Sequence, residues 1–350
     1  MAAVSRDWFL TTLGAPRAWQ IVFGGPLIDL KHAKRDRPGF DWADIRVGHI
    51  DHGYTLHPVT RGIVRPDLGV NYLEPGRDPR DPMNYPETLG VRGHCTRTGG
   101  VLAGIDPDAG YLGAAPGVLL IPYRVTNRSV MNAPGNTFDE PEAGHVAKAI
   151  RHAVHVNRCQ VLSISLGSVF GWKPMGEAVE EACEAGAIVV AAAGQVLHRV
   201  AYPGKYPQTI AVGGIRPQYR PYFTYEGAVQ PDIWAPGAEV WRPDTRPPDD
   251  GRVRYGYDWG DGTSYGTAIV AALAALFLRR FGPELDKRGY RGWQRTELFR
   301  ALLSRGGRSV SGVKNAIAVQ FPGVLAHPPA TWPKPSALER ATLRAAAMVH

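Results

Sequence analysis

The chain has 350 residues, a formal net charge of +8 and a hydrophobic content of 44%, so it can bury a substantial core and wholesale disorder is excluded. Its Lys and Arg residues are scattered, with no dense run and no nucleic-acid module, so nucleic acid is not expected as a partner. The longest apolar run, from Ala268 to Leu278, is too short to span a membrane.

The chain contains three cysteines, which are widely spaced and form no CxxC pair: Cys95, Cys159 and Cys183. Neither a disulfide framework nor a cysteine-based zinc site is therefore expected. The first twenty residues lack the continuous apolar segment of a signal peptide. Both features favour a cytoplasmic protein, with secretion or excision from a longer precursor as the open alternatives.

Short runs rich in β-branched residues alternate along the chain with stretches of helical period. The expected strands are 46–50, 118–124, 161–165, 188–192 and 209–212. They are apolar nearly throughout, which is typical of strands covered on both faces of a parallel sheet. The expected helices are 142–156, 175–184, 264–280 and 294–304. This alternation predicts an α/β fold with three layers, a doubly wound, mostly parallel sheet flanked by helices.

Two segments, 72–92 and 241–254, are dense in proline, glycine and charge, and we expect them to be surface insertions. The end of the chain opens with PPATWPKP and closes in a short helical pattern. We therefore expect one domain over residues 1–325 and a Pro-rich C-terminal tail over residues 326–350.

The first motif that can carry chemistry is VGHIDHG (47–53), an apolar strand that ends in Asp51. Ligands of an open parallel sheet gather at the carboxyl ends of its strands, where an aspartate can orient a histidine. A plain turn aspartate is the alternative.

The second motif is GHCTRTGGVLAG (93–104), in which His94 stands among small residues at a helix start. Such a histidine is open to close approach by other groups, or it is a core or capping residue.

Two further motifs lie downstream. AAAGQ (191–195) ends an expected strand and offers the amide of Gln195 as a donor to a developing oxyanion. DGTSYGTA (261–268) places Ser264 at the start of the buried helix, where backbone N–H groups stabilise negative charge. A hydroxyl nucleophile needs that environment together with a base.

Together these motifs resemble those of the subtilisin-like serine proteases, the subtilases, which carry Asp, His and Ser in this order. Six further segments share the likeness, namely LGAPRAW (13–19), AAP (114–116), SISLG (163–167), YPGKYP (202–207), IAVG (210–213) and APG (235–237). The resemblance covers residues 8–325. It implies a serine endopeptidase that acts on polypeptides through an acyl-enzyme intermediate and needs no cofactor.

The resemblance also implies a role for each motif residue. Ser264 is the expected nucleophile, His94 its general base and Asp51 the group that orients His94. Gln195 and the Ser264 N–H are the expected oxyanion hole. The substrate is expected to lie extended as an added strand beside Ser165, Leu166 and Gly167. Ala193 and Gly194 are expected to shape the pocket for the residue before the cleaved bond.

The chain departs from the family pattern at several of these positions. Gln195 stands where the family usually has Asn, so its amide must fold back to reach the oxyanion. Tyr265, Gly266 and Ala268 follow the serine in place of Met, Ala and Pro, and Cys95 and Arg97 follow His94 in place of Gly and His. We expect Cys95 to be either a thiol-sensitive group or an inert buried thiol. Val59 stands where many members have an acidic calcium ligand, so no metal is expected there.

The sequence allows three other interpretations. The altered motifs also fit a catalytically impaired pseudoprotease that binds peptides. GTSYG (262–266) fits the nucleophile elbow of an esterase, but YGYDWGD (255–261) before it is not an apolar strand and no suitable His follows. A metal site could use His49, Asp51, His52 and His57, or His152 and His155, but side chains along a strand alternate in direction and would not converge.

Overall fold

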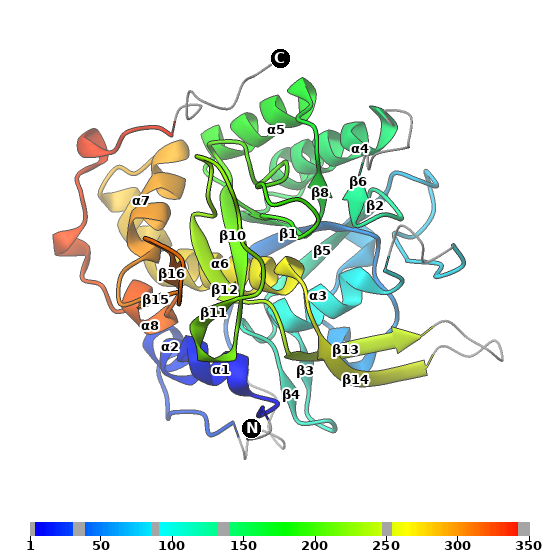
Figure 1. The fold of residues 1–350 in the computed structure, drawn as a ribbon, viewed down its shortest axis with the longest axis horizontal. Helices are drawn as coiled ribbons and strands as arrows, with labels where there is room; N and C mark the ends of the chain where they lie inside the picture. Colours follow the sequence, from blue (N-terminus) through cyan, green and yellow to red (C-terminus); the bar gives the residue numbers. More distant parts are fainter. Residues whose placement is uncertain (1–3, 31–38, 86–90, 132–139, 247–253, 342–350) are drawn as a thin grey trace.

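A computed structural model describes residues 4–30, 39–85, 91–131, 140–246 and 254–341, and its centre is a ten-stranded sheet (Figure 1). The strands of this sheet are β1 (Arg46–Asp51), β2 (Val70–Asn71), β5 (Leu119–Arg124), β7 (Val161–Ile164), β9 (Ile188–Ala192), β10 (Ile210–Arg216), β11 (Arg220–Pro221), β12 (Ile233–Pro236), β15 (Arg308–Ser309) and β16 (Ile317–Ala318). Their order is β15-β16-β12-β10-β9-β7-β1-β5-β2, and β11 also pairs with β10. Neighbours from β2 to β16 are parallel, whereas β15 and β11 pair antiparallel.

Three smaller sheets have two strands each: β3 (Ile105–Asp106) with β4 (Tyr111–Leu112), β6 (Val130–Met131) with β8 (Gly167–Ser168), and β13 (Val240–Arg246) with β14 (Arg254–Gly260). The pair β6–β8 is parallel, and the other two are antiparallel.

Helices cover both faces of the central sheet. They are α1 (Trp8–Leu13), α2 (Ala15–Phe23), α3 (His94–Ala103), α4 (Glu140–Arg151), α5 (Lys173–Glu184), α6 (Thr263–Lys287), α7 (Trp293–Leu303) and α8 (Phe321–Leu325). A π-helical turn, His152–Val156, continues α4. The helices α4 and α5 lie together at the top of Figure 1, and α6 crosses the centre of the molecule.

The strand sequences explain this three-layer arrangement. In β9, Ile188 and Val190 pack into the core cluster that contains α6, while Val189 and Ala191 pack into the cluster that contains α4 and α5. Alternate side chains of a strand point to opposite faces, so a strand apolar throughout must be covered on both sides. The predicted fold class is therefore confirmed.

The predicted elements match the structure closely, with two extensions and one change. The helix expected over 264–280 runs to Lys287, and the strand expected over 209–212 runs to Arg216. The segment 241–254 was expected as an insertion only, but all of its described residues belong to the hairpin β13–β14. The stretch 255–261, judged not to be an apolar strand, contains most of β14, whose residues are all exposed or half-buried and which lies outside the central sheet.

The C-terminal residues that the structure describes pack on the domain. Trp332 is buried against aromatic residues of α6. The short helical pattern expected at the very end of the chain lies outside the described residues. Within the ranges described, no helix is both long and apolar enough to cross a membrane.

Candidate active site

Asp51 and His94 meet where the last residue of β1 faces the first residue of α3. The Nδ1 atom of His94 lies 2.8 Å from Asp51 Oδ1 and 2.9 Å from Oδ2. A carboxylate can only accept, so the Nδ1 atom carries the proton and Nε2 is the bare nitrogen. Both side chains are buried, Asp51 completely.

The carboxylate of Asp51 is kept charged in this buried place. Burial by itself raises the pKa of Asp51, but the charge of His94 and its hydrogen bond lower it, and the net pKa lies well below the usual range. The backbone N–H of His52 donates to Asp51 Oδ1 at 2.7 Å. The hydroxyl of Thr98 donates to Oδ2 at 3.3 Å.

Ser264 completes this chain of hydrogen bonds. It is the second residue of α6, and its Oγ lies 3.1 Å from His94 Nε2. The carbonyl of Ser165 is a second acceptor for the Ser264 hydroxyl, at 3.2 Å. The Ser165 hydroxyl in turn donates to the Ser264 carbonyl at 3.2 Å. A hydroxyl beside a bare imidazole nitrogen at a helix N-terminus is placed to act as a nucleophile.

Gln195 folds back onto the start of α6. Its Oε1 accepts the backbone N–H of Thr263 at 2.7 Å and the Thr263 hydroxyl at 3.2 Å. The amide oxygen is thus occupied, and the Nε2 donor makes no hydrogen bond to any of the residues that the structure describes. The Gln195 side chain is one methylene longer than that of Asn, and this length lets its oxygen contact the first residue of the helix that carries Ser264.

The residues expected to bind substrate surround this point. Ser165 directly follows β7 and contacts Ser264, and Leu166 beside it is buried. Gly167 belongs to β8, and its N–H donates to the carbonyl of Ser129 at 3.1 Å. The backbone edge expected to receive a substrate strand is therefore paired with the segment that leads into β6.

Ala193 and Gly194 follow β9 and precede Gln195. Ala193 is fully buried. Gly194 has a φ of +88°, a conformation that favours glycine, and its carbonyl accepts the Tyr225 hydroxyl at 2.6 Å. This turn directs Gln195 toward α6.

Sequence reasoning did not assign His49 and Thr98 to the site, yet both lie against Asp51. The Nε2 atom of His49 is 3.0 Å from Thr98 Oγ1 and 3.8 Å from Asp51 Oδ2. The signal for His49 was its place two residues before Asp51 on the same face of a strand. Thr98 lies one helical turn after His94, on the same side of α3.

His52 was expected to point away from Asp51, but it also lies near His94. The two imidazole rings are 5.0 Å apart between centroids, and burial lowers the pKa of His52. Potential metal-ligand atoms of Asp51, His52 and His94 lie within 4.8 Å of one another. Among the described residues, this is the one group of three such side chains. Because both oxygens of Asp51 face His94 Nδ1, the arrangement is that of a hydrogen-bonded pair.

Cys95 lies directly after His94 and is buried. Burial raises the pKa of its thiol well above the usual value, and its Sγ lies 3.4 Å from His49 Nδ1. Only the thiolate is a good nucleophile, so this cysteine has the environment of an inert buried thiol rather than of a thiol-sensitive group.

Both insertions hold the helix that begins at His94. Asp81, from the first insertion, accepts the backbone N–H of Gly93 at 2.7 Å, directly before His94. Asp244, from the hairpin, forms an ion pair with Arg97 at 3.0 Å. The position of His94 therefore depends on contacts made from two distant parts of the chain.

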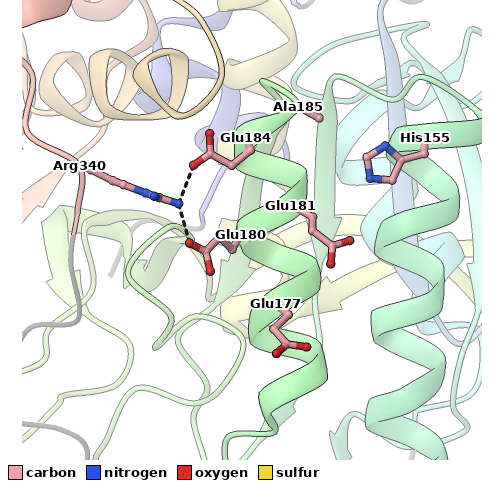
Figure 2. Close-up of a pocket in the computed structure, with 7 residues that line it drawn as sticks. All are labelled: His155, Glu177, Glu180, Glu181, Glu184, Ala185 and Arg340. Atoms are coloured by element: carbon pink, nitrogen blue, oxygen red, sulfur yellow. Dashed lines mark hydrogen bonds and ion pairs between the residues drawn. The ribbon is translucent and has the colours of Figure 1, made fainter.

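A hollow of about 540 Å³ lies on the outer face of α5, and its lining is acidic (Figure 2). It is lined by His155, Glu177, Glu180, Glu181, Glu184, Ala185 and Arg340. Figure 2 shows the guanidinium of Arg340 directed at two carboxylates, Glu180 at 2.7 Å and Glu184 at 2.6 Å. The hollow shares no residue with the Asp51–His94–Ser264 cluster.

Comparisons with known proteins extend the likeness well beyond short motifs. The family model of the subtilases (Peptidase_S8) matches residues 43–305. Subtilisin DY of Bacillus licheniformis is 30% identical over 270 residues, which cover 75% of this chain and 86% of the relative. Subtilisin E of Bacillus subtilis (strain 168) is 31% identical over 239 residues, which cover 65% of this chain and 57% of the relative.

Solved structures share the fold. A protease structure from Pseudoalteromonas arctica PAMC 21717 matches with a TM-score of 0.69 and 18% identity, covering 92% of this chain and 96% of that chain. MycP1 with its N-terminal propeptide removed matches with a TM-score of 0.63 and 21% identity, covering 91% and 96% respectively.

Proposed function

Because the chain belongs to the subtilase family of serine endopeptidases, we propose that Asp51, His94 and Ser264 are its catalytic triad. The observation that carries this proposal is the unbroken chain of contacts from Ser264 Oγ to His94 Nε2, 3.1 Å, and from His94 Nδ1 to Asp51, 2.8 Å. The peptide-binding pseudoprotease receives no comparable support, since these contacts are those that a working triad needs.

In the proposed reaction, Ser264 attacks the carbonyl carbon of the scissile peptide bond. His94 takes the hydroxyl proton through Nε2 and later gives it to the leaving amine, which leaves an acyl group on Ser264. Asp51 holds the imidazole with its proton on Nδ1 and stabilises the imidazolium that forms. A water molecule activated by the same nitrogen then hydrolyses the acyl-enzyme.

The negative oxygen of the tetrahedral intermediate needs preorganised donors. We assign these to the backbone N–H of Ser264 and to the Nε2 amide of Gln195. The contact of Gln195 Oε1 with Thr263 supports this assignment, because it fixes the amide with its oxygen toward the helix and its donor nitrogen available.

Polypeptide is the substrate class, and we propose that it binds as an extended strand. Its backbone would run beside Ser165, Leu166 and Gly167, while Ala193 and Gly194 shape the pocket next to the scissile bond. The hydrogen bond from Gly167 to Ser129 must open before the substrate can use that N–H.

The comparisons lend no support to the cytoplasmic location expected from the sequence. The expected lack of a nucleic-acid partner stays a prediction.

A fluorophosphonate probe tests the triad directly, because it reacts with activated serines. We expect a single adduct on Ser264, located by peptide mass spectrometry, and none in Ser264→Ala. Ser165→Ala is the matched control, since Ser165 contacts Ser264 but is not the proposed nucleophile, and its adduct on Ser264 should persist. Folded wild-type protein that forms no adduct would contradict the triad and favour the peptide-binding alternative.

A further inference from the structure

Three buried polar groups lie close to Asp51, and the proposed mechanism uses none of them. His49 is 2% exposed, Cys95 2% and Thr98 0%. Buried polar side chains are costly unless they are hydrogen-bonded, so their arrangement calls for a physical account.

Their contacts form one continuous line that ends at the carboxylate. Cys95 Sγ lies 3.4 Å from His49 Nδ1, and His49 Nε2 lies 3.0 Å from Thr98 Oγ1. Thr98 Oγ1 lies 3.3 Å from Asp51 Oδ2. His49 Nε2 itself is 3.8 Å from the same oxygen.

The protons on this line can be placed from the charge at its end. The titratable groups that face His49 are Asp51 on its own strand and Cys95 and His94 on α3. Burial lowers the pKa of His49 to about 4, so the ring is neutral and carries one proton. A ring N–H is most favourable toward the negative carboxylate, which puts the proton on Nε2.

Nδ1 is then a bare acceptor, and the thiol of Cys95 is the donor beside it. The Thr98 oxygen accepts from His49 Nε2–H, and its own proton is left to donate. Its possible acceptors are Asp51 Oδ2, the His94 carbonyl at 3.1 Å and the Cys95 carbonyl at 3.2 Å. Of these, only Asp51 is charged, and hydrogen bonds to charged groups are the stronger ones.

We propose that Cys95, His49 and Thr98 form a buried relay of hydrogen bonds that positions the Asp51 carboxylate and thereby holds His94 ready to accept the Ser264 proton. The relay rests on the proposed triad. Its members are positioning residues, since none of them contacts Ser264. When the relay is formed, the Asp51 carboxylate accepts hydrogen bonds from His94, from the His52 N–H and from the Thr98 hydroxyl.

The decisive link is the Thr98 hydroxyl, and its removal is the first test. Thr98→Val should lower kcat about tenfold, the usual effect of losing one hydrogen bond to a charged group, with KM unchanged. The acidic limb of the pH profile of kcat/KM should move to higher pH, because a carboxylate with one donor fewer holds the imidazolium proton more tightly. Thr98→Ser restores the hydroxyl and should restore both values.

Thr96→Val is the matched control, because Thr96 is also a buried threonine on α3. Its hydroxyl bonds to Thr55 rather than to Asp51, at 2.7 and 2.8 Å. This variant should lose stability but keep the position of the acidic limb. A Thr98→Val enzyme with wild-type kcat and an unmoved acidic limb would overturn the relay.

The His49 tautomer gives a second readout that does not depend on activity. Nitrogen-15 chemical shifts of the imidazole in wild-type protein should show the proton on Nε2, and Cys95→Ser, which keeps a donor toward Nδ1, should show the same. A proton on Nδ1 would overturn the relay even if the triad is correct. If instead Ser264 forms no fluorophosphonate adduct while His49 shows the expected tautomer, the triad fails and the hydrogen-bond line stands.

Discussion

Gln195 replaces the asparagine usual in the family, and the structure suggests how it can still work. Its oxygen is held by Thr263, so the two ends of the amide have separate tasks. The oxygen fixes the side chain on α6, and in the proposed oxyanion hole the nitrogen is the donor. Sequence alone could indicate the misfit in length but could not indicate the docking on α6.

Two variants separate these tasks. Gln195→Glu keeps the acceptor for Thr263 and removes the donor, while Gln195→Met removes both and adds no charge. We expect both to lower kcat by about 10²–10³-fold with small changes in KM, as for the loss of one oxyanion donor. Steady-state kinetics on a peptide substrate measures this, and a Gln195→Met enzyme with wild-type kcat would exclude the amide from the oxyanion hole.

The lowered pKa of His49 predicts that the stability of the protein depends on pH. Above about pH 6.5 the ring is neutral in both the folded and unfolded states, so it contributes no pH dependence. Below that, the unfolded chain takes up a proton that the buried ring resists until its pKa of about 4. We therefore expect the free energy of unfolding to fall between pH 6.5 and 4, by up to about 3 kcal/mol from this group.

Chemical denaturation across that pH window measures the effect. His49→Gln removes the titration while leaving a polar side chain of similar size, so its free energy of unfolding should fall less steeply with acid than that of the wild type. If the free energy of unfolding fell equally steeply with acid in both proteins, the pKa of His49 would not be lowered in the folded state.

At the scale of single elements, α3 depends on close packing against β13. A Cβ on Gly100 would lie 2.2 Å from Cγ of Pro243, far inside van der Waals contact. Gly100→Ala should therefore destabilise the protein by about 1–3 kcal/mol, despite the better helix propensity of alanine. The same change at Gly256, on β14, meets nothing within 4 Å and is the matched control.

Kinetics distinguishes a local effect from a global one. If β13 supports the position of His94, Gly100→Ala should also lower kcat at a temperature where the protein is fully folded, and Gly256→Ala should not. Unchanged stability in Gly100→Ala would mean that α3 and β13 can separate without cost.

The elements that could be predicted from the sequence are those whose own residues determine them. The strand of Ile188–Ala192 and the helix of Thr263–Lys287 are apolar enough to be recognised alone. The two-residue strand Ile317–Ala318 could not be, because it is defined by its pairing with β12 on one side and with β15 on the other. Asp51, His94 and Ser264 were predicted from motifs that resemble those of the subtilases, whereas Thr98 needed the packing of α3 against β1 to show its partner.

At the scale of the whole molecule, the described part of the tail closes the core on one side. Trp332 is 7% exposed, and its ring lies 4.9 Å from that of Phe281 and 5.9 Å from that of Tyr290. Arg340 adds ion pairs with α5 that are partly exposed. Exposed ion pairs contribute little, so the tail is held mainly by its tryptophan.

Trp332→Ala should lower the free energy of unfolding by about 3 kcal/mol, because it leaves a cavity beside the aromatic residues. Lys334→Ala, an exposed change in the same segment, should have no effect, and Arg340→Ala should cost less than about 1 kcal/mol. Thermal or denaturant unfolding measures all three. A protein ending at residue 325 that retains wild-type stability would instead show that the tail is dispensable.

The parallel pair β6–β8 has a consequence for which polypeptides can be cleaved. If the substrate binds as the proposed added strand between them, the two backbones must part to about twice the normal strand spacing of 4.8 Å, and the substrate must replace the hydrogen bonds of this ladder. A short peptide makes too few new backbone hydrogen bonds to offset the loss of that ladder, whereas a long, unstructured chain makes several. On this proposal the site should favour long, unstructured chains over short peptides and compact proteins, because only the former can make enough new backbone hydrogen bonds.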